Sequence, residues 1–159
     1  MNRKLTPQQA KQKLKQYCAY QERCHSEVQQ KLFEYGVYKG DAAYIISQLI
    51  EENYLNEERF AILFAGGKFR IKNWGKVKIS YELQQKGISK YCIQKALKNI
   101  DESAYKKTFF RLVEQKMKTI KSEKNIFIRK KKIRDYLLMK GYETTLVNEA
   151  VNDVGIKKP

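Results

Sequence analysis

Turn-forming residues are scarce in this sequence of 159 residues, which has two prolines and eight glycines. So few of them argue against a turn-rich β-protein and favour helices. With 42% hydrophobic and 12% aromatic residues, the chain can still build a hydrophobic core, so wholesale disorder is not expected. The composition therefore predicts a folded, helical protein.

Long apolar segments and a disulfide framework are also absent. The longest apolar run, residues 60–65, is far short of the roughly 20 residues that cross a bilayer. No apolar segment follows Arg3 and Lys4, so no secretory signal is visible. Three cysteines are an odd and sparse set, unlike a secreted disulfide scaffold. We therefore expect a cytoplasmic protein that does not associate with membranes.

Motifs for catalysis and metal binding are missing as well. Cys18, Cys24 and His25 have a spacing that matches no common zinc pattern, and Cys92 would have to supply a fourth ligand. The glycine pair at 66–67 lacks the Lys-Ser/Thr of a phosphate loop, so close helix packing or a kink is the better interpretation. The only histidine lies in a charged stretch, and no carboxylate cluster resembles a nuclease centre. We expect no enzyme activity, no cofactor and no metal.

The sequence has a large excess of positive charge. It carries 33 Lys and Arg against 17 Asp and Glu, a formal net charge of +16. Such an excess points to a polyanionic partner. Nucleic acid, an acidic protein surface and an anionic membrane all fit this charge, and the short apolar runs argue against the membrane.

An internal repeat is the most informative feature. Three stretches share an apolar residue, a leucine four positions later, and a glycine four positions after that: Val28-Leu32-Gly36, Ile79-Leu83-Gly87 and Ile133-Leu137-Gly141. Apolar residues four apart line one helix face. Glycine ends a helix cheaply in the left-handed conformation, and the apolar residue after it can fold back on the leucine. The pattern predicts three helix ends of one design.

Two further helices accompany each of these patterns. One precedes it, at about 7–20, 56–70 and 102–117, where Pro7 behind Thr6 suits a first-turn proline behind its N-cap. The other follows the glycine and has an apolar stripe: Ala42, Ile45, Ile46, Leu49; Ile93, Ala96, Leu97, Ile100; and Val147, Ala150, Val151, Val154. We predict an all-α fold of three tandem three-helix repeats, 1–53, 54–101 and 102–159, in an elongated, curved array. One compact helical bundle is the alternative.

Two stretches without acidic residues are candidates for the partner-binding surface. They contribute Arg59, Lys68, Arg70, Lys72, Lys76 and Lys78, and then Arg129, Lys130, Lys131, Lys132 and Arg134. Such clusters are typical of phosphate contact, although a single cluster is more often a solvated helix face. Trp74, within the first stretch, could stack on a base. A lone tryptophan more often caps a small core.

A run in the middle of the chain resembles a known family. It contains, in order, Asn53-Tyr54-Leu55-Asn56-Glu57-Glu58-Arg59-Phe60-Ala61, then Lys68-x-Arg70, Gly75, and Ile79-x2-Glu82-Leu83-x2-Lys86-Gly87-Ile88. This ordered set is similar to the pattern of the RecX regulators, and the likeness extends more weakly over residues 10–154. The sequence departs from the family pattern at Asn56, where Asp is usual, at Cys24, where Ser is common, and at the glycine pair 66–67, where Arg or polar residues are frequent.

The resemblance implies tandem three-helix repeats and a regulatory role without an active site. It implies a monomer that binds the RecA recombinase and RecA filaments on single-stranded DNA, and that mainly inhibits recombinase, ATPase and co-protease activity. The two basic stretches would supply the surface for RecA or DNA, and single- or double-stranded DNA could be touched directly. A sequence-independent nucleic-acid-binding module that acts without RecA is the rival interpretation, because three-helix units can resemble helix-turn-helix folds.

Overall fold

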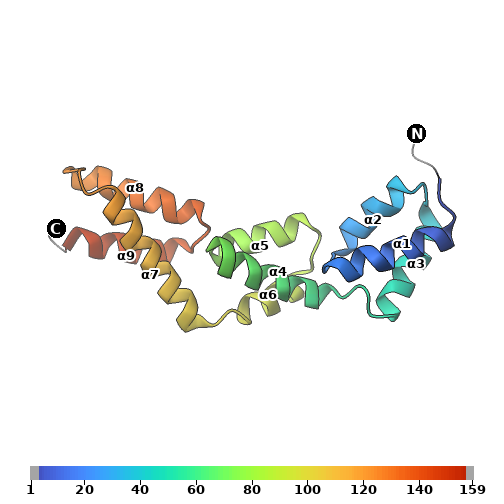
Figure 1. Ribbon diagram of the computed structural model, residues 1–159. Helices are drawn as coiled ribbons and strands as arrows, with labels where there is room; N and C mark the ends of the chain where they lie inside the picture. The colour runs from blue at the N-terminus through green and yellow to red at the C-terminus, as the bar shows by residue number, and fades with distance from the viewer. Residues whose placement is uncertain (1–3, 157–159) are drawn as a thin grey trace. The chain divides into compact units, whose positions relative to one another are not determined.

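The computed structural model describes residues 4–156, with side chains to residue 153 (Figure 1). Within this range, helices joined by short loops make up the fold. This range contains nine α-helices and no strand. The helices are α1 Pro7–Tyr20, α2 His25–Glu34, α3 Lys39–Glu51, α4 Glu57–Lys72, α5 Lys76–Gln85, α6 Lys90–Lys98, α7 Glu102–Thr119, α8 Ile126–Met139 and α9 Thr144–Ile156. The predicted all-α class and the nine helices are confirmed. None of these described helices combines the length and the apolar character that a membrane span needs.

The chain forms two compact units. Unit 1 is Met1–Phe64 with Leu83–Ala96, and unit 2 is Ala65–Glu82 with Leu97–Pro159. The division cuts α4 and α5, so each unit takes one part of both helices. Because this division falls inside the second predicted repeat, the repeat boundaries 1–53, 54–101 and 102–159 stay a prediction.

Unit 1 has its core where α1, α2 and α3 meet (Figure 1). Leu14, Leu32 and Leu49, one from each helix, are fully buried in it. Helix α1 begins with a capping box. Thr6 Oγ1 accepts from the Gln9 backbone N–H at 3.2 Å, and Gln9 Oε1 accepts from the Thr6 N–H at 3.1 Å. This start confirms the predicted Thr6 cap, because the side chains satisfy N–H groups that have no partner within the helix.

Unit 2 has an aromatic centre. The ring of Tyr105 lies 5.7 Å from that of Phe69 and 5.3 Å from that of Tyr142, and Phe109 lies 5.1 Å from Tyr142, between ring centroids. Tyr105, Phe109 and Tyr142 are almost completely buried. Tilted rings at these distances add attraction beyond burial. Val154, the last residue of the third predicted stripe, lies outside the described side chains.

The three repeat glycines end their helices as predicted. Gly36, Gly87 and Gly141 have φ of 76°, 77° and 95°. In each case the next residue donates its N–H back to the carbonyl of the repeat leucine, at 2.9, 3.1 and 3.2 Å, and the glycine N–H donates to the carbonyl three residues earlier, at 3.0 Å. This pair of bonds defines the Schellman motif. One local design therefore closes α2, α5 and α8.

These three turns are also held from outside in the same way. The carbonyl just before each glycine accepts a hydrogen bond from a residue earlier in the chain. Tyr35 O accepts from Leu5 N at 3.0 Å. Lys86 O accepts from Ser26 Oγ, at the start of α2, at 3.0 Å. Lys140 O accepts from Gly75 N, just before α5, at 2.8 Å. The turn after α5 therefore sits at the N-terminal end of α2, and the turn after α8 at the N-terminal end of α5.

Candidate interaction surface

The end of α4 turns sharply and places several cations close together in unit 2. Asn73 has φ of 59°, a left-handed conformation that asparagine tolerates better than most residues. Its N–H donates to Phe69 O at 3.0 Å, and the Trp74 N–H donates to Lys68 O at 3.3 Å. The chain then enters α5 at Lys76. This turn therefore brings the basic end of α4 next to the basic start of α5.

Trp74 is the centre of this group. Its ring has Lys68 Nζ at 5.1 Å and Lys78 Nζ at 4.6 Å from the centroid, which are cation–π distances. The side chain is half-buried and does not belong to the buried core. Both interpretations of Trp74, as a cap on a small core and as a stacking ring for a base, stay predictions. The ring supports two ammonium groups at the surface.

Two glycines bring the third repeat pattern against this turn. A β-carbon on Gly75 would overlap the Gly141 carbonyl group, so the two backbones are in direct contact. The Gly141 carbonyl accepts from Val77 N at 2.9 Å. Lys140, the residue before Gly141, also contacts this turn, because its Nζ donates to Lys72 O at 3.3 Å. Only residues without a side chain permit this contact.

An arginine from α7 completes the cluster. Arg111 Nη2 donates to Asn73 Oδ1 at 2.9 Å, and the Tyr142 hydroxyl donates to Asn73 O at 2.9 Å. Sequence reasoning missed Arg111 and Lys140, because both arrive through long-range contacts. The α4–α5 basic cluster is Lys68, Lys72, Lys76, Lys78, Arg111 and Lys140.

Lys76 is the most restrained cation of the cluster. Its Nζ lies 3.1 Å from Glu102 Oε2 and 4.7 Å from the centroid of the Tyr105 ring. The Tyr105 hydroxyl accepts from Lys76 N at 3.0 Å and donates to Glu143 through a short hydrogen bond. Burial, followed by this bond to the Glu143 carboxylate, raises the pKa of Tyr105. The ion pair with Glu102 therefore offsets part of the charge of Lys76, which makes it a weaker candidate for contact with a partner than Lys72 or Lys78.

A shallow groove continues from the cluster along α7. It has a volume of about 600 Å³. Arg111, a residue of the cluster, and Glu102, which pairs with Lys76, both line it. Its other lining residues are Ser103, Lys106, Lys107, Phe110 and Glu114. Phe110 is half exposed. Cations and one exposed aromatic ring beside the cluster enlarge the surface that a polyanion can contact.

Arg59 and Arg70 belong to the first predicted stretch but lie outside the α4–α5 basic cluster, because their guanidinium groups make other contacts. In unit 1, Arg59 Nε lies 2.5 Å from Glu22 Oε1, and its two Nη atoms donate to Asn53 at 3.0 Å. All three guanidinium nitrogens of Arg59 therefore have partners within unit 1. Arg70 folds back along α4 over Gly66, where a β-carbon would lie 2.7 Å from its Nη1. Helix α4 continues through residues 66–67, and Gly66 makes room for this arginine.

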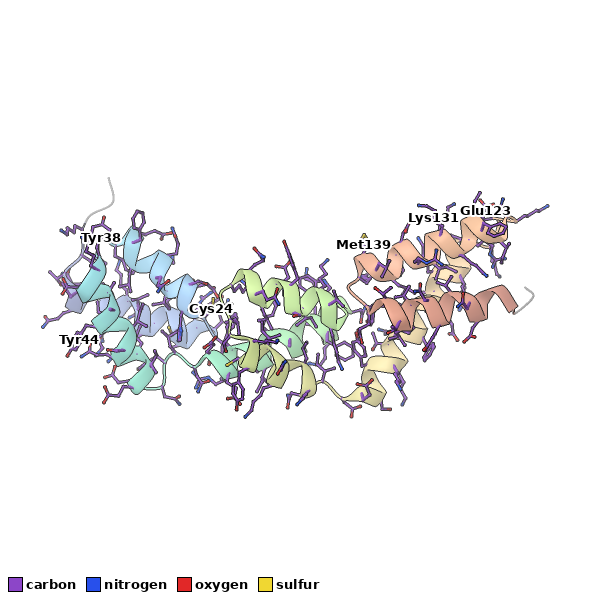
Figure 2. The ribbon with its side chains drawn as sticks, turned by 180° about the vertical axis from the view of Figure 1, so that it is seen from behind. Cys24, Tyr38, Tyr44, Glu123, Lys131 and Met139 are labelled. Carbon is purple, nitrogen blue, oxygen red and sulfur yellow. The ribbon has the colours of Figure 1, made fainter. Side chains whose placement is uncertain are left out.

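The second predicted stretch lies on α8. Lys131 pairs with Asp135 at 2.9 Å, and Lys132 with Glu123 at 3.9 Å, while Lys130 and Arg134 are half-buried. Figure 2 shows Lys131 in the first half of α8 and Met139 at its other end. Because a helix rises 1.5 Å per residue, Arg129 and Lys140 are roughly 16 Å apart along the axis. The second predicted stretch therefore begins near the start of α8, and Lys140, a cation of the α4–α5 basic cluster, lies just after its end.

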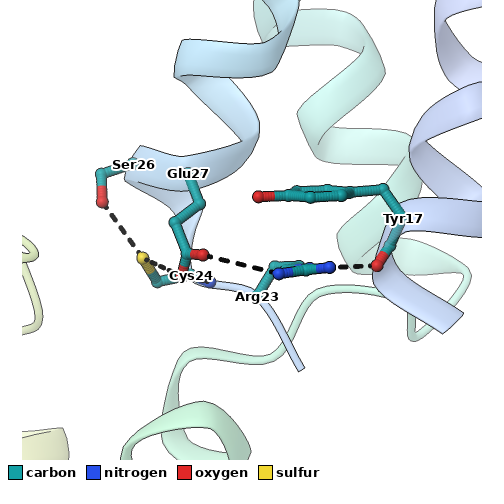
Figure 3. Close-up of polar contacts among 5 residues, drawn as sticks. All are labelled: Tyr17, Arg23, Cys24, Ser26 and Glu27. Carbon is teal, nitrogen blue, oxygen red and sulfur yellow. Dashed lines mark hydrogen bonds and ion pairs between the residues drawn. The ribbon is translucent and has the colours of Figure 1, made fainter. Parts of the chain in front are cut away.

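The residues considered for a metal have structural contacts instead. Cys24 precedes α2, and Glu27 Oε1 accepts from its N–H at 3.2 Å and from its Sγ at 3.1 Å (Figure 3). Arg23 stacks on the Tyr17 ring, 3.7 Å from its centroid, and donates Nε–H to Tyr17 O at 3.1 Å. Burial raises the pKa of the Cys18 thiol to about 11. The described residues include no group of three or more His, Cys, Asp or Glu placed to hold a metal ion.

Comparison with known proteins points in one direction. The family model described as "RecX, second three-helix domain" matches residues 56–97. The regulatory protein RecX of Clostridium perfringens (strain 13 / Type A) is 33% identical over 126 residues, which is 79% of this chain and 58% of that protein. The one of Bacillus cytotoxicus is 25% identical over 143 residues, 89% of this chain and 52% of that protein. The chain therefore spans between half and three fifths of these relatives.

Solved structures agree in fold. The crystal structure of RecX from Lactobacillus salivarius superposes with a TM-score of 0.83 at 20% identity, over 95% of this chain and 97% of that one. A second crystal structure, of a regulatory protein RecX, gives 0.82 at 21% identity, over 92% and 73%. At this identity the likeness shows the fold alone.

Proposed function

The chain belongs to the RecX family, and from this we propose that it binds RecA, both free and as a filament on single-stranded DNA. Bound there, it mainly inhibits the recombinase, ATPase and co-protease activities of RecA. The observation that carries the proposal is the similarity to proteins named regulatory protein RecX over 79% of the chain. It acts by binding, as a monomer in the cytoplasm, and has no catalytic step of its own.

The α4–α5 basic cluster supports this proposal as the main contact surface. It gathers six cations at the turn between α4 and α5, two of them over the ring of the half-buried Trp74, and Glu102 pairs with Lys76. A RecA filament presents acidic protein groups and DNA phosphates, and both attract such a surface. The second basic stretch on α8 adds further contacts on the same chain. Several weak contacts on one chain strengthen each other through effective concentration.

Direct nucleic-acid binding without RecA is the second candidate function. Trp74 favours it, because an aromatic ring flanked by two ammonium groups combines a stacking face with phosphate-binding charge. The two candidates differ in one respect. A RecA regulator binds the filament much more tightly than naked DNA, whereas a DNA-binding module does not need RecA.

Trp74 fluorescence provides the test. It is the only tryptophan of the chain, so the tryptophan emission of a complex with an oligonucleotide reports on the cluster alone. Naked single-stranded DNA is titrated first. Binding to labelled RecA–DNA filaments is then measured by anisotropy across salt concentrations. The proposal predicts at least tenfold tighter binding to the filament than to DNA. Equal affinity for both would select the DNA-binding module.

Charge variants locate the surface. Replacing Lys68, Lys72 and Lys78 by Gln removes three cluster cations, and about 0.7 counterion is released per contact to single-stranded nucleic acid. The slope of log affinity against log salt should therefore flatten by about 2, so that over a fourfold rise in salt wild type loses about twentyfold more affinity than the variant.

The matched control replaces three lysines of unit 1 and the α6 region, Lys13, Lys90 and Lys98, which are all exposed. It changes the net charge equally and should leave the salt slope unchanged, because none of the three lysines belongs to the α4–α5 basic cluster. Changing Lys130, Lys131, Lys132 and Arg134 to Gln tests the α8 stretch in the same way. If both basic variants keep wild-type affinity and slope, the charge is solvated surface and the binding site lies elsewhere.

A further inference from the structure

Helix α8 begins differently from the two helices that are equivalent to it. Helices α2 and α5 start at residues 25 and 76, each 11 residues before its glycine, whereas α8 starts at 126, 15 residues before Gly141. Asn125 is the N-cap of this additional turn, and its Oδ1 accepts from Phe127 N at 2.9 Å and from Ile128 N at 3.3 Å. Unit 2 therefore has one extra helical turn at this end.

The extra turn exposes apolar side chains. Phe127 is 80% exposed, and Ile126 and Ile128 are about 40% exposed. Beside them lies a mainly apolar groove of about 300 Å³. Its lining is formed by Glu114, Met117, Lys118, Lys121 and Arg129. Arg129 Nε is buried and has no hydrogen-bond partner, so the charged guanidinium is poorly solvated and gains from an acceptor beside its more accessible N–H groups. The α8 end surface is defined here as Met117, Lys121, Ile126, Phe127, Ile128 and Arg129.

The N-terminal ends of α2 and α5, which are equivalent to the start of α8, each contact a turn that ends another helix. At each of them sits a helix-ending turn, whose carbonyl accepts a hydrogen bond, Lys86 O from Ser26 and Lys140 O from Gly75. In the described part of the chain, no such turn sits on the start of α8. The C-terminal turn of a helix exposes carbonyl oxygens and carries partial negative charge. Its carbonyl oxygens are acceptors for the guanidinium of Arg129.

Charge and side-chain type define the partner. Residues 116–134 hold nine Lys or Arg against one Glu, a net +8 that is half of the charge of the chain. A second copy, also at +16, would be repelled, whereas an acidic protein would be attracted. Isoleucine offers no stacking face to a base, and an exposed apolar patch with a polar rim is typical of protein contacts. These features favour an acidic protein over nucleic acid.

We propose that the α8 end surface docks an acidic surface of RecA that presents the C-terminal turn of a helix, with Phe127 as the apolar anchor and Arg129 as the donor to its carbonyl. This inference rests on the proposed function and names a second contact, distinct from the α4–α5 basic cluster. The docking resembles the seating of turns at α2 and α5, but with a partner protein supplying the turn.

The test uses RecA filaments and the full chain. In the variant Phe127→Asp the anchor becomes a charge that repels an acidic partner, and in Arg129→Gln the donor is lost. Tyr20→Asp is the matched control, because Tyr20 is an aromatic residue with 84% exposure in unit 1. Circular dichroism and melting curves verify that each variant folds. We expect Phe127→Asp and Arg129→Gln each to weaken filament binding at least about tenfold, as anchor residues do, and Tyr20→Asp to leave it unchanged.

A photo-reactive benzoylphenylalanine at position 127 identifies the contact directly. Crosslinks should map to an acidic RecA segment at a helix end. Wild-type affinity of Phe127→Asp would overturn this inference alone, and crosslinks to DNA or to a second copy of this chain would overturn it in favour of those partners. If wild type itself fails to bind RecA, the proposed function fails and this inference with it.

Discussion

Replacing three glycines by alanine separates two physical effects that the structure places at different positions. Gly87 has φ of 77° and open space around it, so an alanine there meets backbone strain alone. Gly75 has no positive φ, but an added β-carbon overlaps the Gly141 carbonyl. Gly141 combines φ of 95° with overlap against Lys78. The three variants should therefore differ in a defined order.

The expected magnitudes follow from these environments. Gly87→Ala should cost about 1–2 kcal/mol, the strain of a left-handed L-residue. Gly75→Ala should cost about 1–3 kcal/mol, as overpacking does, and Gly141→Ala roughly the sum. For a chain of this size, about 1 kcal/mol lowers the Tm by roughly 2–4 °C. Gly40 is the control, because it has open space and no positive φ at the start of α3. Gly40→Ala should be neutral or stabilising.

Thermal and urea unfolding followed by circular dichroism measure these effects. A further variant, Gly87→Asn, checks the strain argument, because asparagine tolerates the left-handed region and should cost less than alanine. If Gly75→Ala is no more destabilising than Gly40→Ala, the backbone contact between Gly75 and Gly141 is wrong. The position of Lys140 in the basic cluster would then be wrong too.

Four other properties are open to measurement. Asn125→Ala should destabilise the protein by about 1 kcal/mol through loss of the α8 cap, as urea unfolding would show; no change would mean that the extra turn is not capped. Cys18, with a pKa of about 11, should react slowly with iodoacetamide at pH 8 and faster towards pH 11; rapid reaction at pH 8 would contradict its burial. Burial raises the pKa values of Tyr105 and Tyr142 above the unfolded value of about 10, so their contribution to stability is complete below pH 10 and is lost as the pH rises above it; urea unfolding at pH 9 and 11 tests this, and a flat profile would refute it. Chelator should leave the Tm unchanged, and stoichiometric zinc in the purified protein would overturn the assignment of Cys24 to a structural role.

Local rules made the helix ends predictable from the sequence. A glycine behind an apolar i, i+4 pair has one cheap conformation, so Gly36, Gly87 and Gly141 could be assigned as helix ends from spacing alone. The Thr6 cap follows from similar local chemistry. Asn53, with φ of 66°, also ends a helix in the left-handed conformation. The sequence reading missed it because asparagine adopts this conformation only in some contexts.

Only part of the α4–α5 basic cluster could be predicted from the sequence. Lys68, Lys72, Lys76 and Lys78 are neighbours in the sequence, so their grouping was visible as an acid-free stretch. Lys140 joins them through the contact between two glycines 66 residues apart in the sequence, and Arg111 through its hydrogen bond to Asn73. No periodicity signals either contact. The acid-free stretch also suggested Arg59, whose guanidinium is bound to Glu22 and Asn53. Charge patterns identify cations, whereas tertiary contacts decide which of them remain available.

ATP hydrolysis by RecA on single-stranded DNA tests the central claim most directly. The rate is measured on preformed filaments with increasing amounts of this protein, and with the Lys68, Lys72 and Lys78 to Gln variant in parallel. The proposed function predicts that the wild-type protein lowers the rate to a saturating limit and that the variant requires a higher concentration. An unchanged rate with folded protein, at concentrations that saturate its binding to naked DNA, would contradict the claim.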